Sequence, residues 1–266
     1  MEKKIWNEHV WKRQTITDLQ ERFGRGRNWI KKTLDKSEAR SSLDIQPQEI
    51  ICVFDATHIG ENILLVGREP NLGVNLVWAW IESETKEAYE SLKQNIESRG
   101  FKLNGVVLDG RTGIPRVFDG SPIQICQFHQ LKIIQRKLTL RPETEAGQTL
   151  LSIGLTITKK DEQTLSKELG DWFKKYKSFT NEKTYILGTR RWRYTHRRVR
   201  SAYNSLKKNL PYLYTYQKYP ELKIPNTTNS LDGYWSRLKN LLSAHRGKTK
   251  ERMRKLATEI LRKQTA

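Results

Sequence analysis

The sequence predicts an α/β protein in which helices pack on a mixed sheet, preceded by a helix-turn-helix and interrupted by an α-helical insertion. Three observations lead to this fold class. Short apolar runs rich in β-branched residues alternate with amphipathic helices over residues 50–138. Two short basic helices precede this region. Residues 142–224 then repeat their apolar side chains at helical spacing.

The charge distribution points to a polyanionic partner. The chain has 266 residues and a net charge of +20, which is unevenly distributed. Residues 1–44 carry a net charge of +4 and residues 45–145 carry −2. Residues 146–266 hold 27 basic and 9 acidic residues, a net charge of +18. A surface whose charges serve only solubility does not need such an excess of positive charge. We therefore expect the chain to bind nucleic acid.

The chain has two cysteines, Cys52 and Cys126, which is typical of a reducing compartment. No apolar run is long enough to span a membrane, and the first residues lack the apolar centre of a signal peptide. We therefore expect a cytoplasmic, nucleoid-associated protein with no membrane contact.

Residues 1–40 are predicted to form a helix-turn-helix DNA-binding domain. Thr15 or Thr17 can cap a first helix, and the GRGR stretch at 24–27 breaks it. A second helix then turns Trp29, Ile30 and Leu34 inward. Its outer face is basic, as in a helix that enters the major groove, although an ordinary helical hairpin fits the same pattern. The expected DNA contacts here are Arg25, Arg27, Asn28, Lys31 and Lys32.

After a polar linker, the predicted order is three strands, a helix, a strand, a short helix, a strand and a helix. The amphipathic helix over 84–100 ends at Gly100. The strands are expected at 50–58, 61–69, 73–83, 103–109 and the short run before Cys126.

Two carboxylates stand at the ends of predicted apolar strands. Asp55 ends "IICVFD" and Asp109 ends "LNGVVLD". If those strands are neighbours, both side chains emerge at one edge of the sheet, where two nearby carboxylates invite a divalent cation. Either aspartate alone is more simply a turn residue, since Asp-Gly is a common turn pair.

The segment over 142–224 is predicted to be a strongly basic α-helical insertion. Leu165, Leu169 and Trp172 share one helical face, and Val199 and Tyr203 share another. Within it, the stretch "TRRWRYTHRR" is expected to contact DNA. The indole ring of Trp192 either stacks on an unpaired base or packs against other residues of the fold. The residues expected to touch DNA are Arg191, Trp192 and Arg193.

A last helix, within 227–247, carries the lone carboxylate Asp232. With Asn229 as the cap and Ser230 as the first residue, Asp232 is an ordinary first-turn acid, stabilised by about 0.3–1 kcal/mol through the helix dipole. Alternatively, Asp232 is a metal ligand at the start of a basic helix face that contacts the DNA backbone. That face and the residues beyond it contribute Lys239, His245 and Arg246 as expected DNA contacts.

The motifs "FDATHIGE", "VVLDGRTG", "CQFHQ" and "IPNTTNSLDGYWSRLK", in this order, resemble those of Mutator-type (MULE-like) DDE transposases of bacterial insertion sequences. The resemblance covers residues 50 to 250, and only the four motifs together are specific. It implies a ribonuclease-H-like core over 46–141 and 225–250, interrupted by the insertion over 142–224. Residues 251–266 are left as a basic tail. It also implies that Asp55 and Asp109 are the first two catalytic acids.

At Asp232 the sequence departs from the family, which usually has Glu at the matching position. The related mariner group uses a third Asp, so the residue is compatible with metal binding. The shorter side chain is equally compatible with a decayed, inactive copy. Glu221 is the nearest alternative acid, but it precedes the helix and falls in a turn.

Cys126 and His129 suggest zinc, but a structural zinc site needs four ligands, and the chain has no second CxxC or HxxxH pair. The resemblance implies instead that "CQFH" lies beside the active site. His129 and Cys126 are therefore expected to be active-site neighbours, and His58, three residues past Asp55, is a further one.

The expected function is that of a DNA transposase that binds its element ends and catalyses strand cleavage and strand transfer. Asp55, Asp109 and Asp232 are expected to hold two Mg²⁺ or Mn²⁺ ions, which activate the attacking oxygen and stabilise the leaving one. The partners are double-stranded DNA, as terminal repeats and target, and further copies of the chain in a dimer or larger assembly. The alternatives are a structure-specific nuclease and a catalytically dead, transposase-derived DNA-binding protein.

Overall fold

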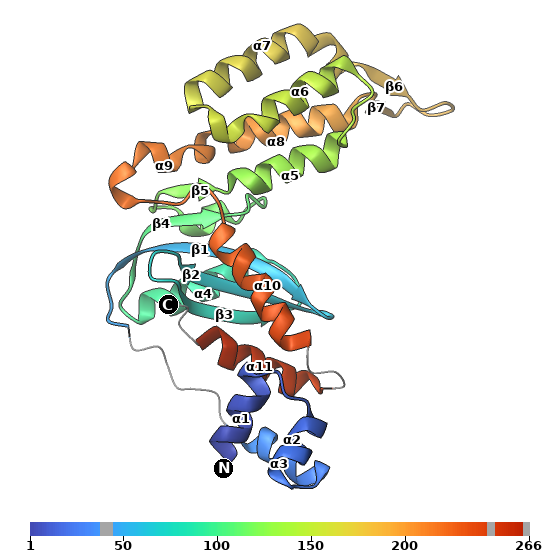
Figure 1. Cartoon of the computed structure of the whole chain (residues 1–266). Coiled ribbons are helices and arrows are strands. Elements are labelled where there is room, and N and C mark those ends of the chain that lie inside the picture. The colour runs from blue at the N-terminus through green and yellow to red at the C-terminus, as the bar shows by residue number, and fades with distance from the viewer. Residues whose placement is uncertain (38–44, 244–247, 263–266) are drawn as a thin grey trace.

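A five-stranded mixed sheet forms the centre of the computed structural model, which describes residues 1–37, 45–243 and 248–262 (Figure 1). The strand order is β3-β2-β1-β4-β5. β1 pairs antiparallel with β2 and β2 with β3, whereas β4 runs parallel to both β1 and β5. The mixed α/β class predicted from the sequence is confirmed. The strands are β1 (Glu49–Ile59), β2 (Asn62–Glu69), β3 (Val74–Ile81), β4 (Lys102–Leu108) and β5 (Ile123–Ile125).

Each face of the sheet is covered by a different helix. Alternate residues of a strand point to opposite faces, so β1 supplies both layers. Cys52 and Phe54 join the apolar cluster under α4 (Lys86–Ser98). Ile51 and Val53 join the cluster under α10 (Asn229–Ser243). A short 3₁₀ helix, η1 (Pro115–Phe118), closes the α4 side.

Three helices form the N-terminal unit: α1 (Glu2–Trp11), α2 (Ile16–Phe23) and α3 (Arg27–Lys36). Thr15 caps α2 in a capping box with Asp18, and Gly24 ends the helix in the left-handed conformation. The two predicted helices and the turn between them are therefore present, and α1 is an additional helix. The inward placement of Trp29 was wrong. Its ring is 37% exposed, with the Arg25 guanidinium 5.3 Å from its centroid.

The part of the expected basic tail that the structure describes forms a helix, α11 (Lys250–Arg262). This helix packs beside α10 and β3 and touches α1 (Figure 1). The Tyr234 hydroxyl donates to the Ile260 carbonyl at 3.0 Å, and Arg252 bonds Asp35 at the end of α3 at 2.6 Å. α11 thus joins the N-terminal unit to the sheet.

The insertion stands at the β5 edge of the sheet, at the opposite end of the molecule from the N-terminal helices (Figure 1). It has its own apolar core, which α5 shares, although residues up to 141 were assigned to the catalytic core. A small hairpin, which the helical pattern did not predict, projects from it. The elements are α5 (Gln127–Leu138), α6 (Glu145–Leu155), η2 (Ile157–Lys159), α7 (Glu162–Asn181), β6 (Lys183–Tyr185), β7 (Trp192–Tyr194), α8 (Arg197–Leu213), α9 (Thr215–Lys218) and η3 (Pro220–Leu222).

None of the helices in the described part of the chain is both long and apolar enough to cross a lipid bilayer.

Asn75 is a buried polar link between the sheet and α11. It accepts a hydrogen bond from Arg68 Nη1 at 2.9 Å and donates to the Leu261 carbonyl at 3.0 Å. We expect Asn75→Ala to lower the free energy of unfolding by about 2–3 kcal/mol, because it removes a buried partner from both groups. Urea denaturation measures the loss. The exposed Asn71→Ala is the control, expected to cost less than about 1 kcal/mol. Equal losses in the two variants would contradict the link.

Candidate active site

Strand register brings Asp55 and Asp109 to the same level of the sheet. Val53 of β1 pairs with Val107 of the parallel strand β4. Asp55 and Asp109 lie two residues farther along their respective chains. Val53 and Val107 both belong to the cluster under α10, so Asp55 emerges on the α10 face. The expectation that these two strands are neighbours is confirmed.

Asp55 is a buried carboxylate held by an indole. β1 continues past the end of β4 because it still pairs with β2 there, and Asp55 lies opposite Val66. Only 8% of the residue is exposed, and Trp235 Nε1 donates a 2.7 Å hydrogen bond to its Oδ2. Burial raises the pKa of Asp55 from 3.8 to about 6, although the Trp235 bond and the charge of His129 act in the opposite direction. The negative charge of Asp232 raises it further.

Asp109 directly follows β4 and is half-buried. Its Oδ1 accepts a hydrogen bond from the Arg111 backbone N–H at 2.9 Å, and Gly110 adopts φ +81°. One carboxylate oxygen therefore stabilises an Asp-Gly turn, which is the role expected for this aspartate if it is only a turn residue. The same residue also lines a cavity, described below.

Asp232 lies in the first turn of α10, which begins at Asn229, one residue before the predicted start. The residue is half-buried, and it is near enough to Asp55 for its charge to affect the pKa of that carboxyl. The helix buries an apolar stripe of Leu231, Leu238 and Leu242 together with two aromatic residues. One of these aromatics, Trp235, is the donor to Asp55, a role that the sequence did not suggest.

The three aspartates fit a magnesium site in chemistry and in placement, but not as a ready-made cluster. Carboxylate oxygens are the ligands that Mg²⁺ and Mn²⁺ prefer. Within residues 1–37, 45–243 and 248–262, however, no three His, Cys, Asp or Glu side chains are grouped closely enough to hold an ion. One oxygen of Asp55 is engaged by Trp235 and one of Asp109 by Arg111. Shared ligation by all three acids therefore requires the carboxylates to shift.

Cys126 and His129 connect α5 to the segment before α10. The Cys126 sulfur caps α5 by accepting from the His129 backbone N–H at 3.5 Å. It also accepts from the backbone N–H and the hydroxyl of Thr228, at 3.4 and 3.5 Å. Thr228 Oγ1 lies 3.3 Å from His129 Nδ1. The "CQFH" and "TTN" motifs, a hundred residues apart, are thus in direct contact.

His129 carries a positive charge beside the carboxylates. Its pKa is raised to about 9, first by its interaction with the Cys126 side chain and then by the charges of Asp55 and Asp109, against the effect of burial. Burial raises the pKa of Cys126, but hydrogen bonds with His129 and Thr228 outweigh it and lower the value overall. A protonated imidazole therefore offsets the negative charge of the aspartates at neutral pH.

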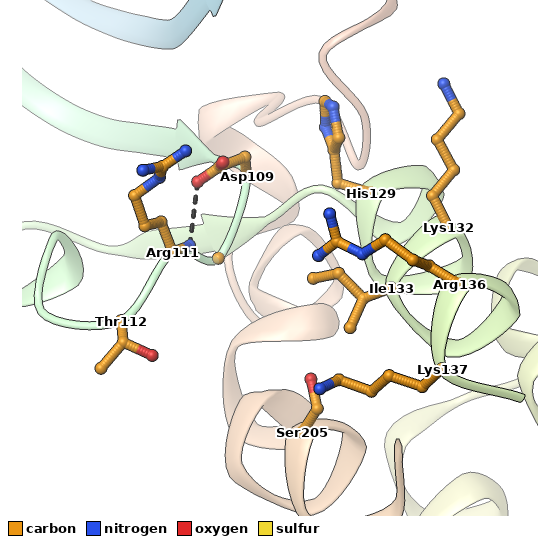
Figure 2. Close-up of a pocket in the computed structure, with 10 residues that line it drawn as sticks. Asp109, Arg111, Thr112, His129, Lys132, Ile133, Arg136, Lys137 and Ser205 are labelled. Atoms are coloured by element: carbon orange, nitrogen blue, oxygen red, sulfur yellow. Dashed lines mark hydrogen bonds between the residues drawn. The ribbon is translucent and has the colours of Figure 1, made fainter. Parts of the chain in front are cut away.

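A cavity of about 650 Å³ opens beside Asp109. Figure 2 shows Asp109 and His129 near one another at its rim, with Arg136 reaching from α5 toward the loop that carries Arg111. α8 supplies the facing wall. Lys132 and Arg136 were not predicted, although they follow His129 at helical spacing along α5. The lining residues are Asp109, Gly110, Arg111, Thr112, His129, Lys132, Ile133, Arg136, Lys137 and Ser205.

Of the other predicted site residues that the structure describes, His58 faces away from the carboxylates and Lys239 is on the surface. His58 is exposed, and alternation along β1 directs it to the face opposite Asp55. Lys239 is exposed on α10. His245 and Arg246 lie outside the described residues. The structure therefore does not bring His58 to the site expected for it.

The predicted DNA contacts are on the surface. Those of the N-terminal unit line α3 and the turn before it. Those of the insertion lie on or beside β7, where Trp192 is 43% exposed with Lys183 Nζ 4.0 Å from its ring centroid. In the first group Arg25, Arg27, Asn28 and Lys32 are exposed and Lys31 is half-buried, and in the second Arg191 and Arg193 are exposed.

No protein-family model matches the chain, and no curated protein is similar to it.

The buried carboxylate makes a prediction for stability. We expect Asp55→Asn to stabilise the metal-free protein above pH 6 by at most about 3 kcal/mol, since a tenfold change in proton affinity corresponds to about 1.4 kcal/mol. Asn keeps an acceptor for Trp235 and removes the buried charge. Because the folded pKa is raised, the difference between variant and wild type should be near zero at pH 4 and grow as the pH rises through 6.

Thermal or urea unfolding with EDTA at several pH values measures that difference. The exposed Asp119→Asn is the control and should change the free energy of unfolding by less than about 0.5 kcal/mol at every pH. A destabilised Asp55→Asn at pH 8 would show that the charge is stabilising in its site.

A second prediction concerns the charge of His129. Cys126→Ser removes the largest cause of its raised pKa, so the pKa of His129 should fall from about 9 toward its ordinary value. Titration of the imidazole nitrogens by NMR measures the change. Thr149→Ser, within the insertion, is the control and should leave the value unchanged. A pKa that stays near 9 without the thiol would assign the shift to the aspartates alone.

Proposed function

We propose that the chain is a DNA transposase of the DDE type, similar to the Mutator-type enzymes of bacterial insertion sequences. In this proposal it binds element ends and catalyses metal-dependent strand cleavage and strand transfer. One observation carries the proposal. Asp55 and Asp109 stand at the same level of adjacent parallel strands, under a helix whose first turn holds Asp232.

The topology supports the finer assignment to a ribonuclease-H-like core. Three antiparallel strands, β1 to β3, are extended on the other side of β1 by the parallel strands β4 and β5. The helical insertion lies between the last strand and α10, where the resemblance places it. N-terminal helices with an exposed basic face support a role in recognising DNA.

Each residue of the site then has a definite task. Asp55, Asp109 and Asp232 would hold the Mg²⁺ or Mn²⁺ ions, which supply Lewis acidity to the attacking and leaving oxygens. Trp235 orients Asp55 through its indole N–H. His129, held protonated by Cys126 and the aspartates, presents positive charge where a phosphodiester approaches. A dimer or larger assembly on paired ends completes the proposal.

A second candidate, a DNA-binding protein without catalysis, is favoured by two observations. The described carboxylates do not form a three-ligand group, and the third acid is Asp rather than the longer Glu. Such a protein would keep the basic surfaces and lose the chemistry.

Cleavage assays separate these candidates. We expect the wild type, with Mn²⁺, to cut and join DNA fragments spanning the sequences on either side of its own gene. Asp109→Asn should lower the rate by on the order of a thousandfold or more, because it removes a metal ligand. Asp232→Glu should retain or raise activity, since Glu is the acid usual at this position in the resembled family.

The exposed Asp119→Asn is the matched control and should cut at the wild-type rate. Cut products without joined products would identify a nuclease on the same site. DNA binding with no Mn²⁺-dependent product from the wild type or from Asp232→Glu would select the non-catalytic candidate.

A further inference from the structure

The cavity beside Asp109 has the properties of a phosphate site. Besides Asp109, its lining contains five side chains that carry or can carry positive charge, from two parts of the chain. Arg111 comes from the loop after β4, and His129, Lys132, Arg136 and Lys137 come from α5. Such a concentration of cations in a concave site raises the local concentration of a polyanion.

Arg136 is the cation best placed to take up a ligand. Its side chain extends from α5 across the cavity toward the Arg111 loop (Figure 2), and it is exposed. Among the described residues it has no side-chain hydrogen bond or ion pair. Arg111, by contrast, is paired with Glu84 at 2.8 Å, and Lys137 donates to Ser201 Oγ at 2.6 Å. A guanidinium matches the geometry of phosphate through two parallel N–H bonds.

The backbone that carries Arg136 is tied to the wall opposite α5. Arg198 of α8 donates to the carbonyls of Lys137 and Arg136, at 2.8 and 3.2 Å. These bonds join the end of α5 to the start of α8, so the cavity lies between two rigid elements. Walls held in this way need little rearrangement when a phosphate binds.

The size of the cavity limits its occupant. A volume of about 650 Å³ is that of a site for a molecule of small-ligand size, on the scale of one or two nucleotides. A space of this size takes one or two nucleotides of a single strand rather than a duplex. Because Asp109 lines the same space, the bound nucleotides lie next to the carboxylates.

We propose that this cavity, which we call the strand chamber, binds the backbone phosphates of unpaired DNA next to the scissile phosphate, with Arg136 as the main contact. The inference rests on the proposed function, since it takes DNA as the substrate. It adds that the substrate strand is separated from its complement before or during cleavage. Arg136 is a binding residue in this account, not a catalytic one.

Binding to two DNA probes tests the chamber directly. The probes are a blunt duplex and the same duplex ending in a fork of two unpaired strands, measured by fluorescence anisotropy in EDTA. The wild type should bind the fork more tightly. Arg136→Gln should weaken fork binding on the order of tenfold, and flatten its salt dependence by about one phosphate contact. Its affinity for the blunt duplex should change less than about twofold.

Two further variants control for charge and for shape. Arg141→Gln removes the same charge from an exposed position outside the chamber and should leave the preference for the fork unchanged. Ser205→Tyr narrows the chamber without changing the charge and should reduce that preference. Thermal melting establishes that all three variants are folded.

The results that would overturn the chamber are specific. Equal loss of affinity for both probes in Arg136→Gln would assign Arg136 to general attraction of duplex DNA. No loss for either probe would show that the cavity binds no phosphate. Failure of the proposed function looks different. In that case the fork preference and its loss in Arg136→Gln persist, while the wild type with Mn²⁺ yields no cut or joined DNA.

Discussion

The register between the parallel strands β1 and β4 is the constraint on which the site depends. Val53 opposite Val107 leaves Asp55 and Asp109 at one level, and a slip of one residue would turn Asp55 into the opposite layer of the sheet. The register is held by burial on both faces, because each strand supplies side chains to the cluster under α4 and to the cluster under α10. The register between β1 and β4 shifts between Ile50 and Ile51. The pairing that places Val53 opposite Val107 follows this shift.

This constraint carries a cost that the surrounding residues offset. A carboxylate at 8% exposure is poorly solvated, and its pKa of about 6 reflects that. Trp235 supplies one hydrogen bond and His129 a positive charge, and neither residue is beside Asp55 in the sequence. The same helix that brings Asp232 to the site also brings the indole that steadies Asp55. α10 therefore contributes both an acidic side chain of the site and the hydrogen bond that stabilises its buried carboxylate.

Much of the fold could be predicted from the sequence because local patterns and tertiary packing agree. The strand that contains Asp55, the strand that precedes Asp109, the Thr15 cap and the apolar stripe of α10 follow from alternation, capping chemistry and helical spacing. The strand with Asp55 runs on to Ile59, past the end expected at that residue, because it still pairs with β2 there. Trp29 was misplaced because its ring pairs with Arg25 on the surface, an interaction that periodicity does not register.

Other features were missed. In α11 the buried residues Leu256, Ala257, Ile260 and Leu261 recur at helical spacing, but they stand among many charges, and composition suggested a tail. The β6–β7 hairpin has three residues in each strand, too few for an alternating pattern. In the site, the link between Trp235 and Asp55 and the cavity between α5 and α8 join segments far apart in the chain. No spacing rule connects such positions.

The placement of α11 has a consequence for the order in which the chain matures at the ribosome. The layer of the sheet under α10 is completed by Leu256 and Ile260, and the N-terminal helices are tied to the same element through Arg252 and Asp35. Residues 250–262 emerge after every strand of the sheet has been synthesised. Until then one apolar layer lacks part of its cover, and the N-terminal helices lack their anchor. Nascent chains of this protein are therefore candidates for chaperone binding up to that late moment, whereas the insertion, with its separate core, can fold earlier.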